Sequence, residues 1–434
     1  MSNSIPERAD VVVIGGGPAG SLAAGLLAQK GFDVVLLEKA KHPRMVVGES
    51  FLPHFWRFTD MLGGATQKIQ AANFVKKAGG IVKWDDSFLR TRFREFGHTR
   101  SPLHVDREIF DQILLDTSRE QGAKVFEETP VRRVDVSADD KVVHYRTLAD
   151  GGEGQIRAPF VIDASGQAAV IAHQLGFREF DEELRFSAVW GYFDSARYLD
   201  FEGKVHPFEE RFDTSPVTFV EAIGGWGWAW KILLRKSVSV GFVLPSERLK
   251  AGGESLEERF HALVATTPFV AKFLAGARFV PESVRAIRNY AYKPVRLAVD
   301  NCYLIGDAAA FVDPINSAGV TFGMYAAVLA AWSIERAMKD HTRRERCQQM
   351  FEDQYLQRLQ IFRLIALPTN RPFTEQEAAD LVRAFRQFSD AEKQLALTTT
   401  ILTNRSEKVR HLFKLVGVED KAIYGKLEIP AELR

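Results

Sequence analysis

The fold of the chain is decided by residues 11–20, which read Val-Val-Val-Ile-Gly-Gly-Gly-Pro-Ala-Gly. The run Val11–Ile14 is continuously apolar and β-branched, as expected of a strand buried on both faces of a parallel sheet. Residues 21–30 are rich in Ala and Leu with a helical period, and they stop at Gly31. A second apolar run, Val34–Leu37, ends on Glu38. The order strand, helix, strand predicts a βαβ unit.

Three glycines inside this unit, Gly15, Gly17 and Gly20, have the spacing G-x-G-x-x-G. The first permits a tight turn, the second lets backbone N–H groups approach a pyrophosphate, and the third allows the helix to pack closely on the strand. Glu38 lies where a carboxylate accepts hydrogen bonds from ribose hydroxyls, so the pattern indicates FAD or NAD. We expect two adjoining residues to contact the same cofactor: Ala19 and Lys39.

Later segments extend the same architecture. Residues 161–166 and 303–309 are apolar runs that end in small residues, and a long helical run follows from about 320 to 338. Residues 186–245 alternate instead, in segments at 186–193, 226–234 and 237–243 that are typical of antiparallel strands. The region from about 343 onward reads as helical, with a capping box at 374–377. An α/β fold with an inserted sheet is therefore expected.

Composition narrows the class of protein. The 434 residues carry 57 Lys and Arg against 56 Asp and Glu, so the net charge of +1 provides no broad field for nucleic acid. Two cysteines, Cys302 and Cys347, and the lack of a secretory signal predict a cytoplasmic protein. The ten His lack metal-ligand spacing, so we expect no protein-bound metal, and no apolar stretch is long enough for a transmembrane segment.

Three longer motifs carry a family resemblance. Residues 43–50 read Pro-Arg-Met-Val-Val-Gly-Glu-Ser, residues 104–111 read His-Val-Asp-Arg-Glu-Ile-Phe-Asp, and residues 311–320 read Phe-Val-Asp-Pro-Ile-Asn-Ser-Ala-Gly-Val. With these, the chain from Ala9 to about Met338 resembles the FAD-dependent monooxygenases of glutathione-reductase-like fold. Within them it resembles the flavin-dependent halogenases of pyrrole, phenol and indole rings. The resemblance assigns flavin contacts to Arg44, Gly48, Glu49, Ser50, Arg107, Gly306, Asp307, Pro314, Gly319 and Val320.

The resemblance also implies the division of the chain. We expect a discontinuous, Rossmann-like FAD-binding domain of the glutathione-reductase type over residues 1–185 and 285–340. An antiparallel-sheet substrate domain is expected over residues 186–284, lying over the flavin. Residues 341–434 are expected to form a helical C-terminal region that serves as a lid, a docking surface or an oligomer interface.

Four residues match catalytic positions of the halogenases. Lys77, in the segment 74–79, matches the lysine thought to hold or be converted by hypohalous acid, and Ser317 lies in the segment that surrounds the halide. Trp228 and Trp230 match the tryptophans of the family's WxWxIP motif, which are thought to keep substrate away from the flavin. Alternation along a strand predicts that Trp226 shares their face. Leu233 stands where the motif has proline, which leaves halogenation in question.

The implied reaction starts from reduced FAD and O2, which give a C4a-hydroperoxide whose distal oxygen is electrophilic. If chloride or bromide reaches it first, hypohalous acid forms and passes to Lys77. If an electron-rich indole, pyrrole or phenol reaches it first, the ring is hydroxylated. The substrate is free, tethered to a carrier protein, or a tryptophan of a polypeptide, and these alternatives remain open here. The single dinucleotide motif implies that a partner flavin reductase, or transiently bound NAD(P)H, supplies the electrons.

Two other classes share part of the pattern. A geranylgeranyl-reductase-like flavoprotein has similar glycine, GES and GDAA elements, but it would need a long apolar tunnel. A flavin-binding scaffold without catalytic activity would tolerate the loss of Lys77 and Trp228. Coupled oxygen consumption separates the first from a monooxygenase, and substitution of the two residues tests the second.

Overall fold

The computed structural model describes residues 4–84, 87–137, 139–224, 226–250, 255–366, 374–385, 388–390, 393, 414–419 and 423–425. Its first layer is a six-stranded sheet with the strand order β22-β23-β11-β1-β2-β7. All neighbours in it are parallel except β22 and β23. The strands are β1 (Val11–Ile14), β2 (Val34–Leu37), β7 (Lys124–Phe126), β11 (Phe160–Asp163), β22 (Ala298–Val299) and β23 (Cys302–Leu304).

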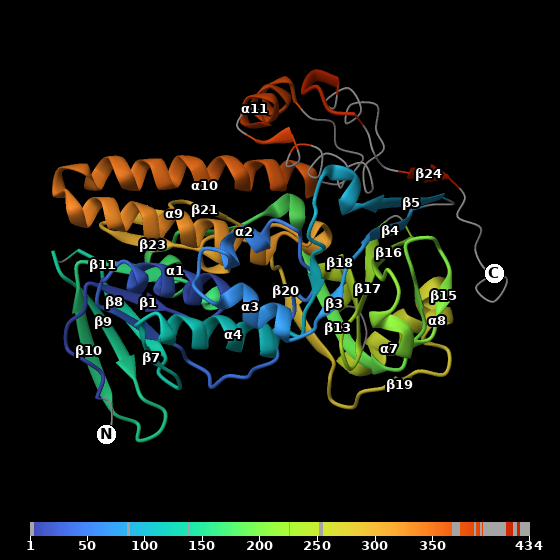
Figure 1. The fold of residues 1–434 in the computed structure, drawn as a ribbon, viewed down its shortest axis with the longest axis horizontal. Coiled ribbons are helices and arrows are strands. Elements are labelled where there is room, and N and C mark those ends of the chain that lie inside the picture. Colours follow the sequence, from blue (N-terminus) through green and yellow to red (C-terminus); the bar gives the residue numbers. More distant parts are fainter. Residues whose placement is uncertain are drawn as a thin grey trace.

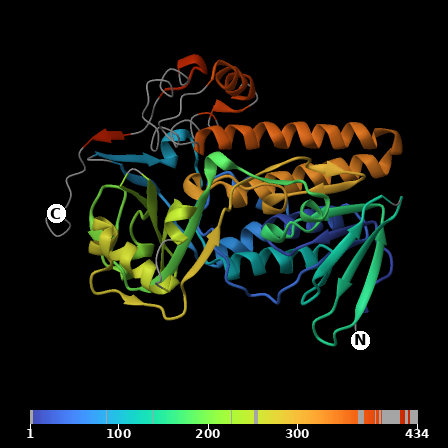
Figure 2. The same cartoon turned by 180° about the vertical axis from the view of Figure 1, so that it is seen from behind.

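Long helices cover this sheet. The helix α1 packs between α4 and α9, and α10 runs back beside α9, as Figures 1 and 2 show. The strands β1 and β2 and these helices share one apolar core, in which the strand residues are almost completely buried. The helices are α1 (Pro18–Gln29), α4 (Arg107–Glu120), α9 (Gly319–Lys339) and α10 (Arg344–Ala366). The strand–helix–strand unit predicted from residues 11–37 is confirmed.

Smaller elements pack against the same core. A three-stranded antiparallel sheet, β10-β9-β8, contributes Val134, Val143 and Ile156 to it. Its strands are β8 (Val131–Asp135), β9 (Lys141–Arg146) and β10 (Glu153–Ala158). Three short helices also pack against this core: α2 (Phe55–Thr59), α3 (Ala65–Ala71) and α5 (Val170–Leu175).

The second large layer is a nine-stranded sheet at the other end of the molecule (Figure 1). Its strand order is β19-β13-β18-β17-β16-β4-β5-β24, with β20 paired to β13. The strands are β4 (Gly79–Trp84), β5 (Ser87–Arg92), β13 (Phe186–Asp194), β16 (Val217–Ile223), β17 (Gly227–Leu233), β18 (Val238–Pro245), β19 (Arg278–Phe279), β20 (Arg285–Arg288) and β24 (Ile423–Gly425). The helices α6 (Ser246–Lys250), α7 (Leu256–Thr266) and α8 (Pro268–Leu274) follow β18.

Short two-stranded pairings lie outside the two large sheets. These are β3 (Val75–Lys76) with β6 (Leu103–His104), β12 (Arg178–Phe180) with β21 (Tyr292–Pro294), and β14 (Tyr198–Leu199) with β15 (Val205–His206). The first of them proves important for the site. No helix in the described ranges has the length and apolarity to cross a membrane.

The sheet boundaries differ from the division expected from the sequence. That division placed residues 79–92 in the nucleotide-binding unit, but β4 pairs with β16 in parallel and β5 continues the same sheet. The sheet is therefore mixed rather than purely antiparallel. The strands β4 and β16 are far apart in the sequence, so neither segment alone predicts that the two pair. The alternation of apolar and polar residues indicates which face of a strand is buried, but it does not identify the neighbouring strand.

The C-terminal region also differs in part. It contains α10 and α11 (Glu375–Phe385), and the capping box is present: Thr374 Oγ1 accepts from Glu377 N at 3.1 Å, and Glu377 Oε2 accepts from Thr374 N at 2.9 Å. It also supplies β24, which pairs with β5. Most of the expected helical stretch after residue 385 lies outside the described residues.

Candidate functional site

The glycine loop after β1 is held by contacts that only glycine allows. A Cβ on Gly15 would lie 2.4 Å from the Ala164 carbonyl oxygen, and one on Gly20 would lie 1.9 Å from the Gly15 oxygen. Gly15 also has φ +102°, a conformation that favours glycine. On Gly17, in contrast, a Cβ would meet only Arg44 Nη2 at 3.5 Å. A side chain on Gly17 would therefore contact the Arg44 guanidinium at the N-terminus of α1 without a clash, whereas Gly15 and Gly20 leave no room for a Cβ.

Glu38 lies beside this loop, buried at the end of β2. Its Oε2 accepts from Gly16 N at 2.6 Å, and its Oε1 accepts from Ala40 N at 2.9 Å. Arg44 approaches from the other side, with Nε 3.8 Å from Glu38 Oε1 and Nη1 3.5 Å from Asp111 Oδ2. Lys39 is exposed beside them. A carboxylate and a guanidinium thus border the open side of the glycine loop.

Arg107 fixes the segment that carries Gly48 and Glu49. Its Nε and Nη2 donate to the two carboxylate oxygens of Asp111 at 2.8 and 2.9 Å, while Nη1 donates to the Val47 carbonyl oxygen at 2.8 Å. A Cβ on Gly48 would lie 2.9 Å from Arg107 Nη1. Tyr192 on β13 donates to Glu49 Oε1 at 2.7 Å, and burial raises the pKa of Glu49. These bonds fix the residues 47–49 to both layers of the molecule.

A third loop, after β23, brings Asp307 toward the glycine loop. A Cβ on Gly306 would lie 3.5 Å from Ala19 Cβ, so this loop and α1 are in direct contact. Gln167 Nε2 donates to Asp307 Oδ2 at 3.2 Å, and burial raises the pKa of that carboxyl group. The end of β23 and the start of α1 thus form one continuous surface.

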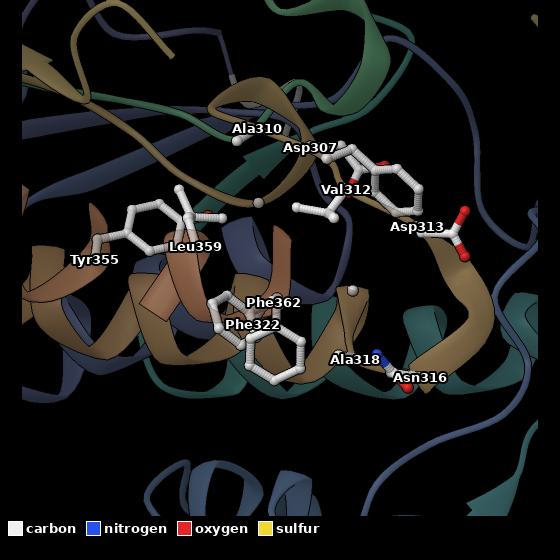
Figure 3. Close-up of a pocket in the computed structure, with 13 residues that line it drawn as sticks. Asp307, Ala310, Val312, Asp313, Asn316, Ala318, Phe322, Tyr355, Leu359 and Phe362 are labelled. Carbon is white, nitrogen blue, oxygen red and sulfur yellow. The ribbon is translucent and has the colours of Figure 1, made fainter. Parts of the chain in front are cut away.

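A narrow cavity of about 30 Å³ continues from this loop. Asp307 and Val312 face it from the loop, and Tyr355, Leu359 and Phe362 close it from α10 (Figure 3). The remaining lining residues are Gly306, Ala310, Phe311, Asp313, Asn316, Ala318, Gly319 and Phe322. Pro314 begins the short turn before Ser317, and Val320 lies in the first turn of α9.

Lys77 lies in a buried polar cluster next to this loop. Its Nζ donates to Ser50 Oγ at 2.8 Å and to the Phe51 carbonyl oxygen at 3.3 Å. Ser317 Oγ donates to the same Ser50 Oγ at 3.0 Å. The structure therefore brings together Lys77, Ser50 and Ser317, which come from three separate motifs.

Three short backbone pairings produce this convergence. Residues of β3, which precede Lys77, pair with β6, and Ser50 forms an isolated bridge with His104 of β6. The Lys77 N–H donates to the Pro102 carbonyl oxygen at 2.9 Å. Ser317 completes the cluster from the left-handed region, with φ +54°. The pairings bring the Lys77 and Ser50 segments together, and the Ser317 segment joins them through the hydrogen bond from Ser317 Oγ to Ser50 Oγ.

Burial dominates the electrostatics of the cluster. Only 3% of Lys77 is exposed, and burial lowers its pKa to about 7. The neighbouring His104 is fully buried, and its pKa is held well below its usual value by burial and by the charge of Lys77. Near neutral pH, Nζ is therefore able to exchange a proton without a large free-energy cost.

Trp228 and Trp230 form a face of the nine-stranded sheet. Their ring centroids are 5.8 Å apart, and both belong to an apolar cluster with Tyr192, Tyr290 and Val312. Trp230 Nε1 donates to Ser239 Oγ at 3.2 Å. The cluster thus connects the pair of tryptophans to the loop 311–320.

Trp226 does not share this face, contrary to the expectation from alternation. The strand β17 begins at Gly227, so Trp226 lies before it and packs with Ala229 and Leu233 on the other side. The Arg248 guanidinium lies 4.4 Å from its ring centroid. Leu233, which replaces the motif proline, also faces that side and leaves the surface of Trp228 and Trp230 unchanged.

Sequence reasoning missed three polar partners. Asp111 lies four residues after Arg107 on α4, a spacing that could have identified the pair. Tyr192 and Thr218 lie on strands of the distant sheet, and no pattern in the sequence connects them to Glu49 or Ser50. Thr218 Oγ1 lies 2.9 Å from Ser50 Oγ and 2.9 Å from His104 Nε2.

Comparison with known proteins places these features in a family. Residues 8–353 match the family model described as an FAD binding domain. The chain is 36% identical over 337 residues to a tryptophan 2-halogenase of Chondromyces crocatus, an alignment that covers 76% of this chain and 62% of the relative. It is 35% identical over 371 residues to the flavin-dependent halogenase armH4 of Armillaria mellea, covering 78% and 67% respectively. The chain thus spans about two thirds of the length of these relatives.

The similarity to a solved structure covers a larger share of this chain than the sequence alignments do. The myxobacterial chondrochloren halogenase CndH superposes with a TM-score of 0.77 at 27% identity, covering 95% of this chain and 97% of that one. Similarity over nearly the whole chain extends beyond the nucleotide-binding motifs to the nine-stranded sheet. The chain belongs to the FAD-binding-domain family and, within it, to the flavin-dependent halogenases.

Proposed function

We propose that the chain catalyses FAD-dependent halogenation of an electron-rich aromatic ring, with Lys77 as the residue that holds the halogen electrophile. The single observation that carries the proposal is the Lys77 cluster: a fully enclosed ammonium bonded to Ser50 and, through it, to Ser317. Halogenase relatives support the same activity. The proposed reaction requires that the residues of the site fit FAD, a halide and an aromatic ring.

The residues fit FAD. Gly17 leaves open space at the N-terminus of α1, where a pyrophosphate is stabilised by free N–H groups. Arg44 Nε is buried without a hydrogen-bond partner among the described residues, so a donor is available at this place. Glu38 retains free acceptor positions for ribose hydroxyls. We therefore assign the dinucleotide to Gly15, Gly17, Ala19, Gly20, Glu38, Lys39 and Arg44, and the flavin end to Gly48, Glu49, Ser50, Arg107, Gly306, Asp307, Pro314, Gly319 and Val320.

Reduced FAD with O2 supplies the oxidising equivalents that convert chloride or bromide to an electrophile. The protein's own residues then control where that electrophile goes. Lys77 has three N–H groups, of which two donate to Ser50 and Phe51, and Nζ also lies 5.1 Å from the centroid of the Phe93 ring. The third N–H has no hydrogen-bond acceptor among the described residues, and we assign it to the electrophile. Exclusion of water around Lys77 strengthens this bond and protects the electrophile from side reactions.

The apolar cluster around Trp228 and Trp230 supports an aromatic substrate. Flat apolar side chains bind a ring by stacking and edge contacts. Because the cluster includes Phe311 and Val312, it places that surface next to the loop of Ser317. We propose that the ring lies against this face, separated from the flavin. The substrate is an indole, pyrrole or phenol, either free or tethered to a carrier protein.

The isoprenoid-reductase alternative finds less support. The relatives are halogenases rather than reductases. Oxygen uptake that accompanies product formation would exclude this alternative.

The test is a bromination assay with FAD, NADH, a flavin reductase, O2, bromide and monochlorodimedone. We expect brominated product from the native chain and a loss of about 100-fold or more in Lys77→Met. Lys76→Met is the matched control, because Lys76 is the exposed neighbour on β3. Hydroxylated product alone, formed equally by the native chain and Lys77→Met, would show that the chain is a hydroxylase.

A further inference from the structure

A continuous chain of hydrogen bonds connects Lys77 to a buried histidine. Lys77 Nζ lies 2.8 Å from Ser50 Oγ, Ser50 Oγ lies 2.9 Å from Thr218 Oγ1, and Thr218 Oγ1 lies 2.9 Å from His104 Nε2. Ser317 joins at Ser50 with a bond of 3.0 Å. Thr218 is on β16, so the chain of bonds crosses from the pairing β3–β6 into the nine-stranded sheet.

The direction of every bond follows from the lysine. An ammonium has donors and no acceptor, so Ser50 Oγ must accept from Lys77. Ser50 also accepts from Ser317, which occupies both of its lone pairs, and its own hydrogen then points to Thr218. Among the hydrogen bonds of the described residues, His104 Nε2 is the acceptor that remains for the Thr218 hydrogen. With Lys77 charged, every hydroxyl hydrogen of the chain of bonds has an acceptor when Nε2 is unprotonated and His104 is neutral.

The surroundings of His104 agree with a neutral ring. Its side chain is fully buried, and the charged groups that act on it are Lys77 from β3 and Lys231 from β17. Both cations and burial lower the pKa of His104, and the backbone of Leu233 opposes them. Among the described residues, no carboxylate contributes to the charge felt by His104 or Lys77.

We propose that His104 is a positioning residue for Lys77, acting through Thr218 and Ser50. Neutral His104 accepts from Thr218, which orients Ser50 so that its lone pairs hold the ammonium and leave one N–H for the site. The hydrogen-bond chain exists independently of catalysis, whereas its role in catalysis rests on the proposed halogenation.

The arrangement disfavours a charge on Lys77 and on His104 at the same time. With both charged, Lys77 would donate to Ser50 and His104 would donate to Thr218, so one of the two hydroxyl hydrogens between Ser50 and Thr218 would lack an acceptor among the described hydrogen bonds. With His104 alone protonated, Thr218 donates to Ser50 and Ser50 donates to Nζ, which accepts as a neutral amine. The chain of bonds is therefore fully paired with one excess proton, on Lys77 or on His104. If the chain is broken at Thr218, Ser50 becomes free to donate to Nζ, which favours the amine and lowers the pKa of Lys77.

The first test is the pH profile of bromination in two variants of Thr218. Thr218→Val keeps the shape and removes the hydroxyl, whereas Thr218→Ser keeps the hydroxyl. We expect Thr218→Val to move the alkaline limb of the profile down by about one pH unit, and Thr218→Ser to leave its position unchanged. His104→Phe should behave like Thr218→Val, and His104→Gln, whose amide oxygen is able to accept, should restore the native limb. Identical limbs in all four variants would overturn the proposal.

The second test does not depend on halogenation. Nitrogen-15 spectra of histidine-labelled protein report which ring nitrogen carries the proton, and His104→Gln identifies the signal. We expect neutral His104 with unprotonated Nε2 near neutral pH, and loss of this preference in Lys77→Met. A protonated Nε2 in the native chain would overturn the proposal even if bromination is observed. If no brominated product forms but the predicted tautomer is found, the hydrogen-bond chain stands and the proposed function fails.

Discussion

Lys77 and Ser50 are 27 residues apart in sequence, yet Lys77 Nζ lies 2.8 Å from Ser50 Oγ in the interior of the molecule. The contact exists because both residues flank the same short strand, β6. Burial of the Lys77 ammonium lowers the free energy of unfolding, so we attribute the presence of this lysine to function rather than to stability.

Replacement of Lys77 by methionine should not destabilise the protein near neutral pH. The pKa of Lys77 is about 7 in the folded state and its ordinary value is 10.5, so the unfolded chain binds more protons between these values. This group therefore lowers the free energy of unfolding most at pH 7 and below, and the penalty disappears as the pH rises toward 10.5. We expect Lys77→Met to raise the thermal midpoint at pH 7 by about 1–3 °C. A midpoint several degrees lower would contradict the assigned cost of burial.

The rate of halogenation should fall as the pH rises through about 7. In the proposed function the ammonium of Lys77 is the form that donates to the electrophile, and it loses its proton near this pH because burial lowers its pKa. The measurement is product formation between pH 6 and 9, with FAD kept reduced by excess reductase. Oxygen uptake without bromide serves as the control and should lack this limb. A rate that rises through the same range would mean that the neutral amine is the active form.

Two glycine substitutions should separate cofactor binding from folding. Gly17→Ala adds a Cβ with no close contact, so the fold should persist while FAD affinity falls by about tenfold or more. Gly20→Ala places a Cβ 1.9 Å from a backbone oxygen and should impair folding itself. Fluorescence titration with FAD and thermal unfolding of the FAD-free protein measure the two effects. Native FAD affinity in Gly17→Ala would show that the pyrophosphate lies elsewhere.

Trp228 should control the partition between halogenated and hydroxylated product. We propose that its face of the sheet, shared with Trp230, holds substrate away from the flavin, so Trp228→Leu should increase the hydroxylated share severalfold. Trp226→Leu is the matched control, because Trp226 packs on the other side of the sheet. Mass spectrometry of products from a phenol or indole gives the ratio. An equal ratio in both variants would remove Trp228 from the separating surface.

The purified chain should oxidise NADH slowly unless a flavin reductase is added. The sequence contains one dinucleotide motif, and the structure uses it in the six-stranded sheet beside Glu38. Absorbance at the NADH band, with and without reductase, measures the dependence. Rapid NADH oxidation by the chain alone would contradict a two-component system.

Much of the nucleotide-binding unit was predictable because its signals are local. The run Val11–Ile14, the three glycines and Glu38 each depend on neighbours within one βαβ unit, and the structure places them as expected. The same holds for the strands β13 and β18 and for the capping box at Thr374. Periodicity and capping depend on residues that are close together in the sequence, so both can be recognised from the sequence itself.

The polar cluster could be predicted only in part. Lys77 and Ser317 were identified by resemblance, but Thr218 and His104 join them through pairings between distant segments. The position of Trp226 was wrong because alternation describes a strand only inside its ends, and β17 starts one residue later. The parallel pairing of β4 with β16 has no local signal at all.

The most direct measurement of the central claim is the yield of brominated ring in the native chain, Lys77→Met and Lys76→Met, assayed side by side with a flavin reductase. We expect brominated product in the native chain and Lys76→Met. In Lys77→Met we expect a loss of about 100-fold or more, with oxygen uptake unchanged in all three. Equal bromination in Lys77→Met and Lys76→Met, or hydroxylated product alone in the native chain, would contradict it.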